Sequence, residues 1–161
     1  MTGKIASRLA SLGLALPQTP KPAGAYVGWA VVGDLVFLAG QVPIEGGVRK
    51  FIGKLGREFG VDDGKRAAQL AALNMLAQLR AACGSDLDRV VRCVRLVGYV
   101  NATESFTDHP QVVDGASDLL HRIFDEAGAH VRSSVGVGSL PSGVAVEIEG
   151  VFQISAPGTF P

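Results

Sequence analysis

Two long helical segments that alternate with strand segments constrain the fold of this chain more than any other feature. Residues 64–82 are rich in Ala, Leu, Gln and Arg, which favour helix. Residues 111–127 place their apolar side chains in one stripe at helical spacing. Strand patterns surround these helices, and they cover residues 26–38, 89–100, 130–138 and 144–154. Because each main helix lies between strands, this order predicts an α+β fold, with one mixed β-sheet and two main helices on one face.

The N-terminal part and the segment after the first strand pattern are less regular. Residues 4–13 form a short amphipathic helix pattern, and the prolines between residues 17 and 22 then predict a stiff, extended link. Residues 44–61 predict an irregular connection with room for one short strand. Their basic side chains are offset by neighbouring acids, and few aromatic residues lie among them. This composition favours a solvated loop over a nucleic-acid-binding patch.

Length and composition bound the class of protein. The chain has 161 residues, 47% of them hydrophobic, with 15 Lys and Arg against 15 Asp and Glu. This balance argues for a single folded domain, and against a protein that grips nucleic acid by charge. A mean hydropathy of +0.28 at zero net charge favours self-association. No window has the apolar length of a membrane span, and the first residues lack a signal-peptide cleavage pattern.

The cysteines, histidines and serines offer no clear nucleophile or metal site. Cys83 and Cys93 have no CxxC spacing and form no zinc pattern with the three histidines, so no metal is expected. Buried, reduced thiols are the simpler interpretation, and they agree with a cytoplasmic location. Ser133 and Ser134 lie in no G-x-S-x-G context, which disfavours a serine nucleophile.

The last two strand patterns contain the most informative charged residues. On the first of them, Arg132 shares a face with Ser134 and other small residues, which leaves room for two-point binding of a carboxylate. On the second, Glu147 and Glu149 share a face about 7 Å apart. A carboxylate in such a position can act as a general base or orient a water molecule. The alternative is that Arg132 simply pairs with one of these glutamates across a hairpin.

Four short motifs make the chain recognisable. In chain order they are Gly-Ala-Tyr at residues 24–26, Leu-Ala-Gly-Gln-Val-Pro at 38–43, Val-Arg-Ser-Ser-Val-Gly-Val-Gly-Ser-Leu-Pro at 131–141, and Val-Glu-Ile-Glu at 146–149. In these motifs the chain resembles the Rid/YjgF family of reactive intermediate (imine/enamine) deaminases, also called the endoribonuclease L-PSP-like family. The resemblance covers roughly residues 20–155, and the last two motifs carry most of it.

The resemblance implies a chorismate-mutase-like fold and a homotrimer. In this family three sheets form a central barrel, the helices lie outside, and ligand clefts lie between subunits. Residues 20–156 would form this domain, and residues 1–19 would be an N-terminal helical extension. By position, Arg132 would bind the substrate carboxylate and Glu147 would position the attacking water. The residues that would complete the substrate site are Tyr26, Gly40 and Ser134.

The activity that the resemblance implies is hydrolysis of reactive 2-imino and 2-enamino acids to 2-oxo acids and ammonia. Anchoring the carboxylate makes the attack of water effectively unimolecular, and the reaction requires no metal or organic cofactor. The implied partner is a small carboxylate-bearing metabolite, without nucleic acid or membrane. Ala39 stands where the family has a serine, which favours a second possibility, a non-catalytic protein that binds such a metabolite. RNA cleavage, a third, is disfavoured by the zero net charge and the few aromatic residues.

Overall fold

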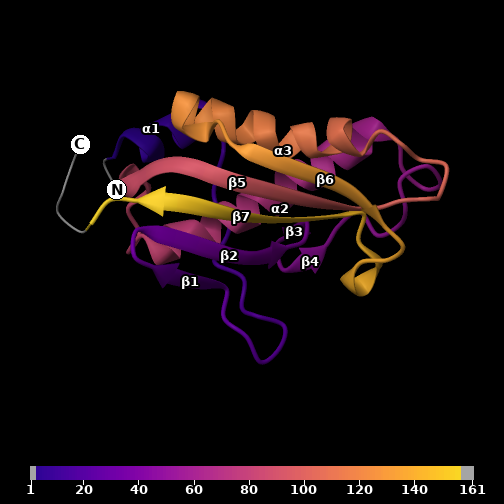
Figure 1. Ribbon diagram of the computed structural model, residues 1–161, viewed down its shortest axis with the longest axis horizontal. Coiled ribbons are helices and arrows are strands. Elements are labelled where there is room, and N and C mark those ends of the chain that lie inside the picture. The colour runs from indigo at the N-terminus through magenta and orange to yellow at the C-terminus, as the bar shows by residue number, and fades with distance from the viewer. Residues whose placement is uncertain (1–2, 157–161) are drawn as a thin grey trace.

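A five-stranded sheet lies at the centre of the fold (Figure 1). The computed structural model describes residues 3–156. In their order across the sheet, the strands are β1 (Trp29–Val32), β2 (Leu35–Gln41), β7 (Val146–Ile154), β5 (Val90–Asn101) and β6 (Val131–Val137). β5 and β6 run parallel, and the other neighbouring pairs are antiparallel. The sheet is therefore mixed, as the sequence predicted.

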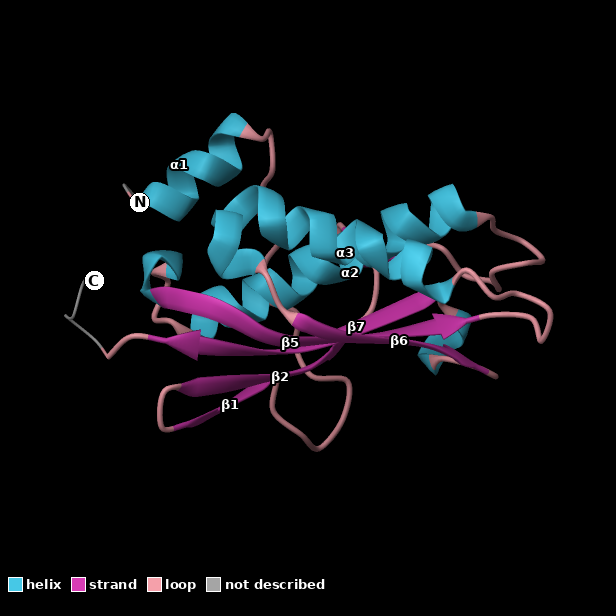
Figure 2. Ribbon diagram, turned by 45° about the horizontal axis from the view of Figure 1, so that its top comes forward, coloured by secondary structure: helices cyan, strands magenta, loops and turns pink. Residues whose placement is uncertain are grey.

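Two long helices lie together over one face of this sheet (Figure 2). They are α2 (Val61–Ala82) and α3 (His109–Phe124). The helices approach each other closely at Gly115 of α3, where a Cβ atom would overlap the carbonyl oxygen of Lys65. Glycine at this position therefore permits a backbone separation that any larger residue would widen. The prediction of two main helices on one face of the sheet is confirmed.

The core lies between these helices and the sheet. Along β7 the burial alternates strictly: Val146, Ile148 and Phe152 are fully buried under the helices, whereas Glu147 and Glu149 lie on the opposite face and are partly exposed. This is the period-two pattern of a strand that has one covered face. The two glutamates therefore belong to the face of the sheet that α2 and α3 leave uncovered.

Two local predictions need correction. α2 begins at residue 61 instead of 64, with Gly60 at its N-cap position. The segment 44–61 contains two short strands, β3 (Ile44–Glu45) and β4 (Val48–Arg49), rather than at most one. They pair as a hairpin, since Gly46 and Gly47 adopt the positive φ angles of 57° and 80° that a tight hairpin turn requires.

The last two strands are not neighbours in the sheet. β5 lies between them, parallel to β6 and antiparallel to β7. The connection between β6 and β7 contains the short 3₁₀ turn Pro141–Gly143 and crosses the end of β5. An ion pair between Arg132 and Glu147 across a hairpin is thus not possible in this topology, and the alternative that the sequence left open is wrong.

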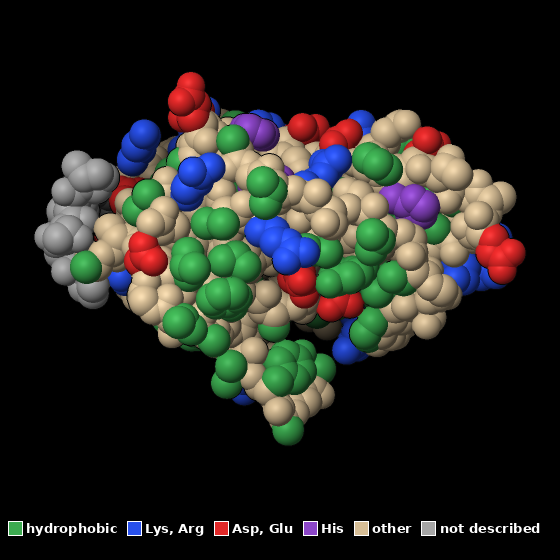
Figure 3. Space-filling model, in the orientation of Figure 1, with side chains coloured by type: hydrophobic (Ala, Val, Ile, Leu, Met, Phe, Trp, Pro, Cys, Tyr) green, Lys and Arg blue, Asp and Glu red, His purple; other side chains and the backbone are tan. Residues whose placement is uncertain are grey.

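The uncovered face of the sheet is rich in exposed apolar side chains. Phe37 pairs with Val151 of β7, and two valines of β6 pair with outward residues of β5. With Val32, which pairs with Leu35 of β2, the exposed side chains on this face are 43–68% exposed: Val32, Phe37, Val131 and Val135. Figure 3 shows hydrophobic side chains gathered over the strands around a few acidic and basic groups. Large exposed apolar surfaces of this kind mark interaction sites.

The N-terminal helix α1 (Lys4–Ser11) docks against the rest of the fold. Its buried residues Ile5 and Leu9 join the hydrophobic core. The carboxylate of Asp88, in the 3₁₀ turn Leu87–Arg89, accepts hydrogen bonds from the backbone N–H groups of Lys4 at 2.7 Å and Ile5 at 2.8 Å. At the other side, a second 3₁₀ turn follows α3 at Asp125–Gly128. In the described part of the chain, no helix is long and apolar enough to cross a bilayer.

Candidate functional site

Three of the predicted site residues line one pocket. Tyr26, Gly40 and Glu147 surround a pocket of about 130 Å³ between the segment before β1 and strands β2 and β7. The Glu147 side chain lies against Gly40, where a Cβ atom would overlap Oε1. Gly40 therefore gives the carboxylate the space that it occupies. Tyr26 is largely exposed. The strand pattern of the sequence included Tyr26, but β1 begins only at Trp29, so Tyr26 lies before the strand.

Glu147 has the electrostatic character of a general base. Burial raises the pKa of its carboxyl group, and the negative charge of Glu149 raises it further. Glu149 is itself held by the hydroxyl of Tyr99, which donates a hydrogen bond to Oε1 at 3.2 Å. Among the described residues, none donates a hydrogen bond to Glu147 or forms an ion pair with it. Its carboxylate is thus available to a water molecule or a ligand.

Two basic residues that the sequence did not single out line the same pocket. They are Lys21, in the segment before β1, and Arg49, on β4. Within the described residues, neither forms an ion pair. Sequence reasoning placed Arg49 in a solvated loop, because no local pattern shows that the β3–β4 hairpin folds back toward β7. The pocket therefore combines an acid with two unpaired cations.

Arg132 lies elsewhere, on the face of β6 that α3 covers. One terminal nitrogen, Nη1, donates to the carboxylate of Asp114 at 2.7 Å and to Ser117 Oγ at 3.0 Å. The other, Nη2, donates to the carbonyl oxygen of Pro110 at 3.3 Å. A guanidinium has five N–H groups. Within residues 3–156, no acceptor contacts the Nε–H group or the second N–H of Nη2, and two such parallel donors suit a carboxylate.

A chain of hydrogen bonds also links Arg132, through Ser117 and His130, to the backbone of Gly128. Ser117 Oγ is 3.0 Å from His130 Nε2, and His130 Nδ1 is 2.6 Å from the carbonyl oxygen of Gly128. Because a carbonyl only accepts, Nδ1 carries the ring proton, Nε2 accepts from the Ser117 hydroxyl, and that hydroxyl accepts from Arg132. Burial lowers the pKa of His130, which favours this neutral ring. Asp114, Ser117 and His130 thus orient Arg132.

The space expected beside Arg132 is filled by protein at Gly136 but not at Gly138. Ser134 Oγ is buried and has no hydrogen-bond partner in the structure. A Cβ atom on Gly136 would overlap the His109 ring, so this glycine accommodates a histidine of α3 rather than a ligand. Gly136 thus leaves no ligand space, whereas no atom of the described residues, apart from the two chain neighbours, lies within 4 Å of a Cβ placed on Gly138. Ser134 does not line the pocket of Glu147.

Within one chain the predicted site is divided. Arg132 and Ser134 lie on β6, which is one edge of the sheet, and they face the helices. Glu147 lies two strands away and points to the uncovered face. The fold thus brings together Tyr26, Gly40 and Glu147, and it separates them from Arg132.

The remaining candidates have structural roles. Burial raises the pKa of Cys83 to about 11 and that of Cys93 to about 12, so both thiols stay protonated and unreactive near neutral pH. Over residues 3–156, no three metal-ligating His, Cys, Asp or Glu side chains gather at one place.

Comparison with known proteins places the chain among relatives that share its fold over most of their length. It is 39% identical over 155 residues to Protein TCP17 of Trypanosoma cruzi, covering 96% of both chains. It is 29% identical over 141 residues to the 2-iminobutanoate/2-iminopropanoate deaminase of Dermatophagoides farinae, covering 88% of this chain and 94% of the relative. A crystal structure of a protein of unknown function from Agrobacterium tumefaciens superposes with a TM-score of 0.89 at 37% identity, covering 94% and 93% of the two chains.

A family model agrees with these relatives. The model described as "YjgF/chorismate mutase-like, putative endoribonuclease" matches residues 6–145, which include Tyr26, Gly40 and Arg132. The match ends at Ala145, two residues before Glu147. The chain belongs to the YjgF/chorismate mutase-like family.

Proposed function

We propose that this protein hydrolyses 2-imino acids to 2-oxo acids and ammonia. The observation that carries the proposal is the Glu147 carboxylate: it is half-buried, has a raised pKa, lies against Gly40 and has no partner among the described side chains. Such a group can accept a proton from a water molecule held beside a substrate carbon. The relative from Dermatophagoides farinae is named for this activity. The motif that contains Glu147, Val-Glu-Ile-Glu, is one of those in which the chain resembles the Rid/YjgF family.

The proposed reaction adds one water molecule to the carbon–nitrogen double bond. Water oxygen bonds to C2 while Glu147 takes a proton from it. Glu147 then returns the proton to the nitrogen, which gives a carbinolamine with a hydroxyl and an amino group on C2. Glu147 next carries the hydroxyl proton to the amino group, the C2=O bond forms as the C2–N bond breaks, and a 2-oxo acid and ammonia leave. A carboxylate anchor holds C2 beside the water, which removes the entropic cost of bringing the two together. Arg132 has two free N–H groups for this role.

We propose that Arg132 reaches the site from a neighbouring subunit. β6 is one edge of the sheet, and β1, next to the Tyr26 segment, is the other. A ring of three copies would bring the β6 edge of each toward the β1–β2 edge of the next. It would also cover the apolar face formed by Val32, Phe37 and the β6 valines. A homotrimer thus accounts for both the divided site and the exposed surface.

The oligomeric state tests this assembly. We expect light scattering to give a mass three times the 16.7 kDa of the chain. Phe37→Glu would place one charge per subunit on the covered apolar face, and burying such a charge without a partner is costly, so this variant should be monomeric. Val48→Glu is the matched control, because Val48 is also exposed but lies on the β3–β4 hairpin. A monomeric wild-type protein would contradict the trimer.

Turnover tests the reaction itself. We would generate 2-iminopropanoate in situ with an amino-acid oxidase and measure ammonia release with and without the protein. Release faster than the spontaneous hydrolysis supports the proposal. A rate equal to the spontaneous one, together with a ligand-induced rise in melting temperature, would select a non-catalytic carboxylate-binding protein instead. That second candidate is favoured by Asp114, which already neutralises part of the Arg132 charge, and by Ala39 in place of a hydroxyl.

The raised pKa of Glu147 predicts the pH dependence of the activity. The base must be ionised, so kcat/KM is full above the raised pKa and falls as the pH drops through it. The midpoint of this acid limb should lie at a higher pH than the usual pKa of a glutamate side chain. Glu149→Gln removes the smaller of the two causes, so it should move the limb to lower pH while burial keeps part of the shift. A limb that is unchanged in this variant would exclude Glu147 as the titrating group.

A further inference from the structure

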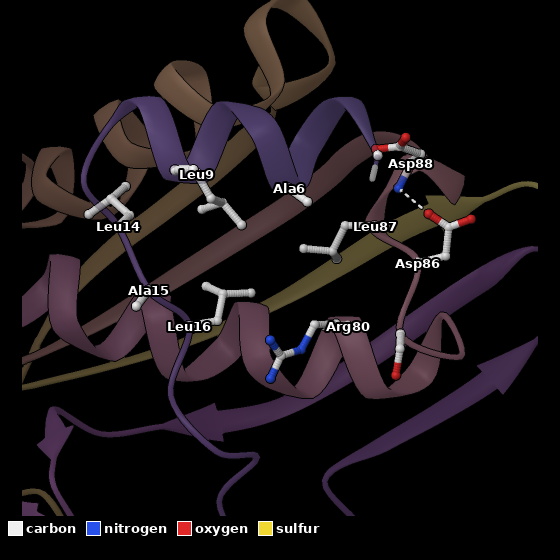
Figure 4. A pocket seen from close by; sticks show the side chains of 12 residues that line it. Ala6, Leu9, Leu14, Ala15, Leu16, Arg80, Asp86, Leu87 and Asp88 are labelled. Carbon is white, nitrogen blue, oxygen red and sulfur yellow. Dashed lines mark hydrogen bonds between the residues drawn. The ribbon is translucent and has the colours of Figure 1, made fainter. Parts of the chain in front are cut away.

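A second pocket lies on the helix side of the molecule, away from Glu147. Its volume is about 510 Å³. It lies between α1 with the segment that follows it, on one side, and the C-terminal end of α2, on the other (Figure 4). This volume is in the range of about 300–1,000 Å³ that small-molecule sites occupy. None of the residues around Glu147 lines it.

The walls of this pocket are mostly apolar. In Figure 4 the leucine side chains of the N-terminal segment and of the turn before β5 point into the same space. The apolar lining comes mainly from Ala6, Leu9, Ala10, Leu14, Leu16 and Leu87. Such a wall can bury an alkyl or aryl group, and each buried CH₂ contributes roughly 0.8 kcal/mol to binding by the hydrophobic effect.

The charged residues of the pocket differ in how far they are satisfied. Asp88 uses both carboxylate oxygens to cap α1, through Lys4 and Ile5. Asp86 accepts a hydrogen bond from the backbone N–H of Asp88 at 3.0 Å. Arg80 makes one long bond, from Nη2 to the carbonyl oxygen of Pro17 at 3.3 Å, and among the described residues no acid pairs with it.

Arg80 also lies apart from the two acids. In Figure 4 its guanidinium points along the pocket toward Leu16, whereas Asp86 and Asp88 lie together beyond Leu87. The pocket thus has an apolar interior, an unpaired cation at one side, and acids that are engaged in backbone hydrogen bonds at the other. A ligand that matches this arrangement has an apolar body and a single negative charge.

We propose that this pocket binds an amphipathic monocarboxylate, with its apolar chain against the leucines and its carboxylate on Arg80. The guanidinium has four N–H groups outside its bond to Pro17, so it can hold a carboxylate at two points. The site is independent of the hydrolytic activity proposed above. It depends on α1, because three of its apolar residues belong to that helix: Ala6, Leu9 and Ala10.

Calorimetric titration with decanoate tests the proposal. We expect saturable binding with one site per chain and a rise in melting temperature. Arg80→Gln should weaken decanoate binding at least tenfold, because an ionised hydrogen-bond donor is lost. Arg66→Gln is the matched control, since Arg66 is another arginine of α2 that does not line the pocket. Ala10→Trp, which fills the pocket from an exposed position of α1, should also abolish binding.

Two further ligands distinguish the contribution of the apolar chain from that of the carboxylate charge. Decanol retains the chain without the charge and should bind at least tenfold more weakly than decanoate to the wild-type protein. Decyltrimethylammonium reverses the charge and should bind more weakly still. Imine hydrolysis should be unchanged in Arg80→Gln and Ala10→Trp, which distinguishes this site from the Glu147 pocket. Absence of decanoate binding, equal affinity in Arg80→Gln, or tighter binding of the cation would each overturn the proposal.

Discussion

Glu147→Gln should lower kcat/KM for 2-iminopropanoate hydrolysis by about 10²–10⁴-fold, the usual contribution of a positioned general base. Glutamine keeps the shape of the side chain against Gly40 but cannot accept the proton of the attacking water. The folded-state pKa of the Glu147 carboxyl is raised, so its negative charge is less favourable in the folded protein than in the unfolded chain. Removing that charge should therefore leave the melting temperature unchanged or slightly higher.

The control for this variant is Glu149→Gln. Glu149 lies on the same face and accepts a hydrogen bond from Tyr99, but it does not line the pocket. It should retain most of the activity and show only the shifted acid limb. If Glu147→Gln keeps full turnover and the same mass in solution as the wild-type protein, Glu147 is not the base and the proposed reaction would need another one.

Arg132→Ala should have the second large effect, expressed mainly in KM. Two charge-assisted hydrogen bonds to the substrate carboxylate are each worth about 1.5–3 kcal/mol, so their loss should reduce kcat/KM by about 10²–10⁴-fold. Arg132→Lys should recover only a small part, because an ammonium group cannot offer two parallel N–H donors. The expected cost in stability is small, since the partner Asp114 is 42% exposed and can be hydrated.

Asp114→Asn distinguishes orientation from binding. This variant keeps the Arg132 guanidinium but removes the carboxylate that Nη1 contacts at 2.7 Å. We expect a loss of activity smaller than that of Arg132→Ala, measured as separate changes in kcat and KM. Full activity in Arg132→Ala would contradict the assigned role, whatever Asp114→Asn shows.

The elements of the fold were predictable because their signals are local. The alanine-rich composition of α2 and the apolar stripe of α3 identify helices within one window of sequence. The strict alternation along β7 shows which residues share a face, so the period of two alone places Glu147 and Glu149 together. The motifs that contain Tyr26, Gly40 and Glu147 then identified three of the residues that line the pocket.

What could not be predicted depends on pairing between distant segments. The periodicity of β6 and β7 is the same whether they are neighbours or separated by β5, so only the tertiary structure excludes a direct pair between Arg132 and Glu147. The contact of Arg132 with Asp114 joins a strand to a helix. Arg49 enters the pocket through a two-residue strand that carries no periodic signal. In each case the sequence shows the residue type but not what it faces.

The hydrogen bonds from Lys4 and Ile5 to Asp88 have a consequence for the order in which the molecule opens. α1 has eight residues and no side-chain cap within its own segment, so a helix of this length is not stable in isolation. Its cap comes from a residue more than eighty positions away, so α1 exists as a helix only when docked. The amides of α1 should therefore exchange with deuterium through a partial unfolding step, while those of β5 and β7 remain protected until the whole domain unfolds.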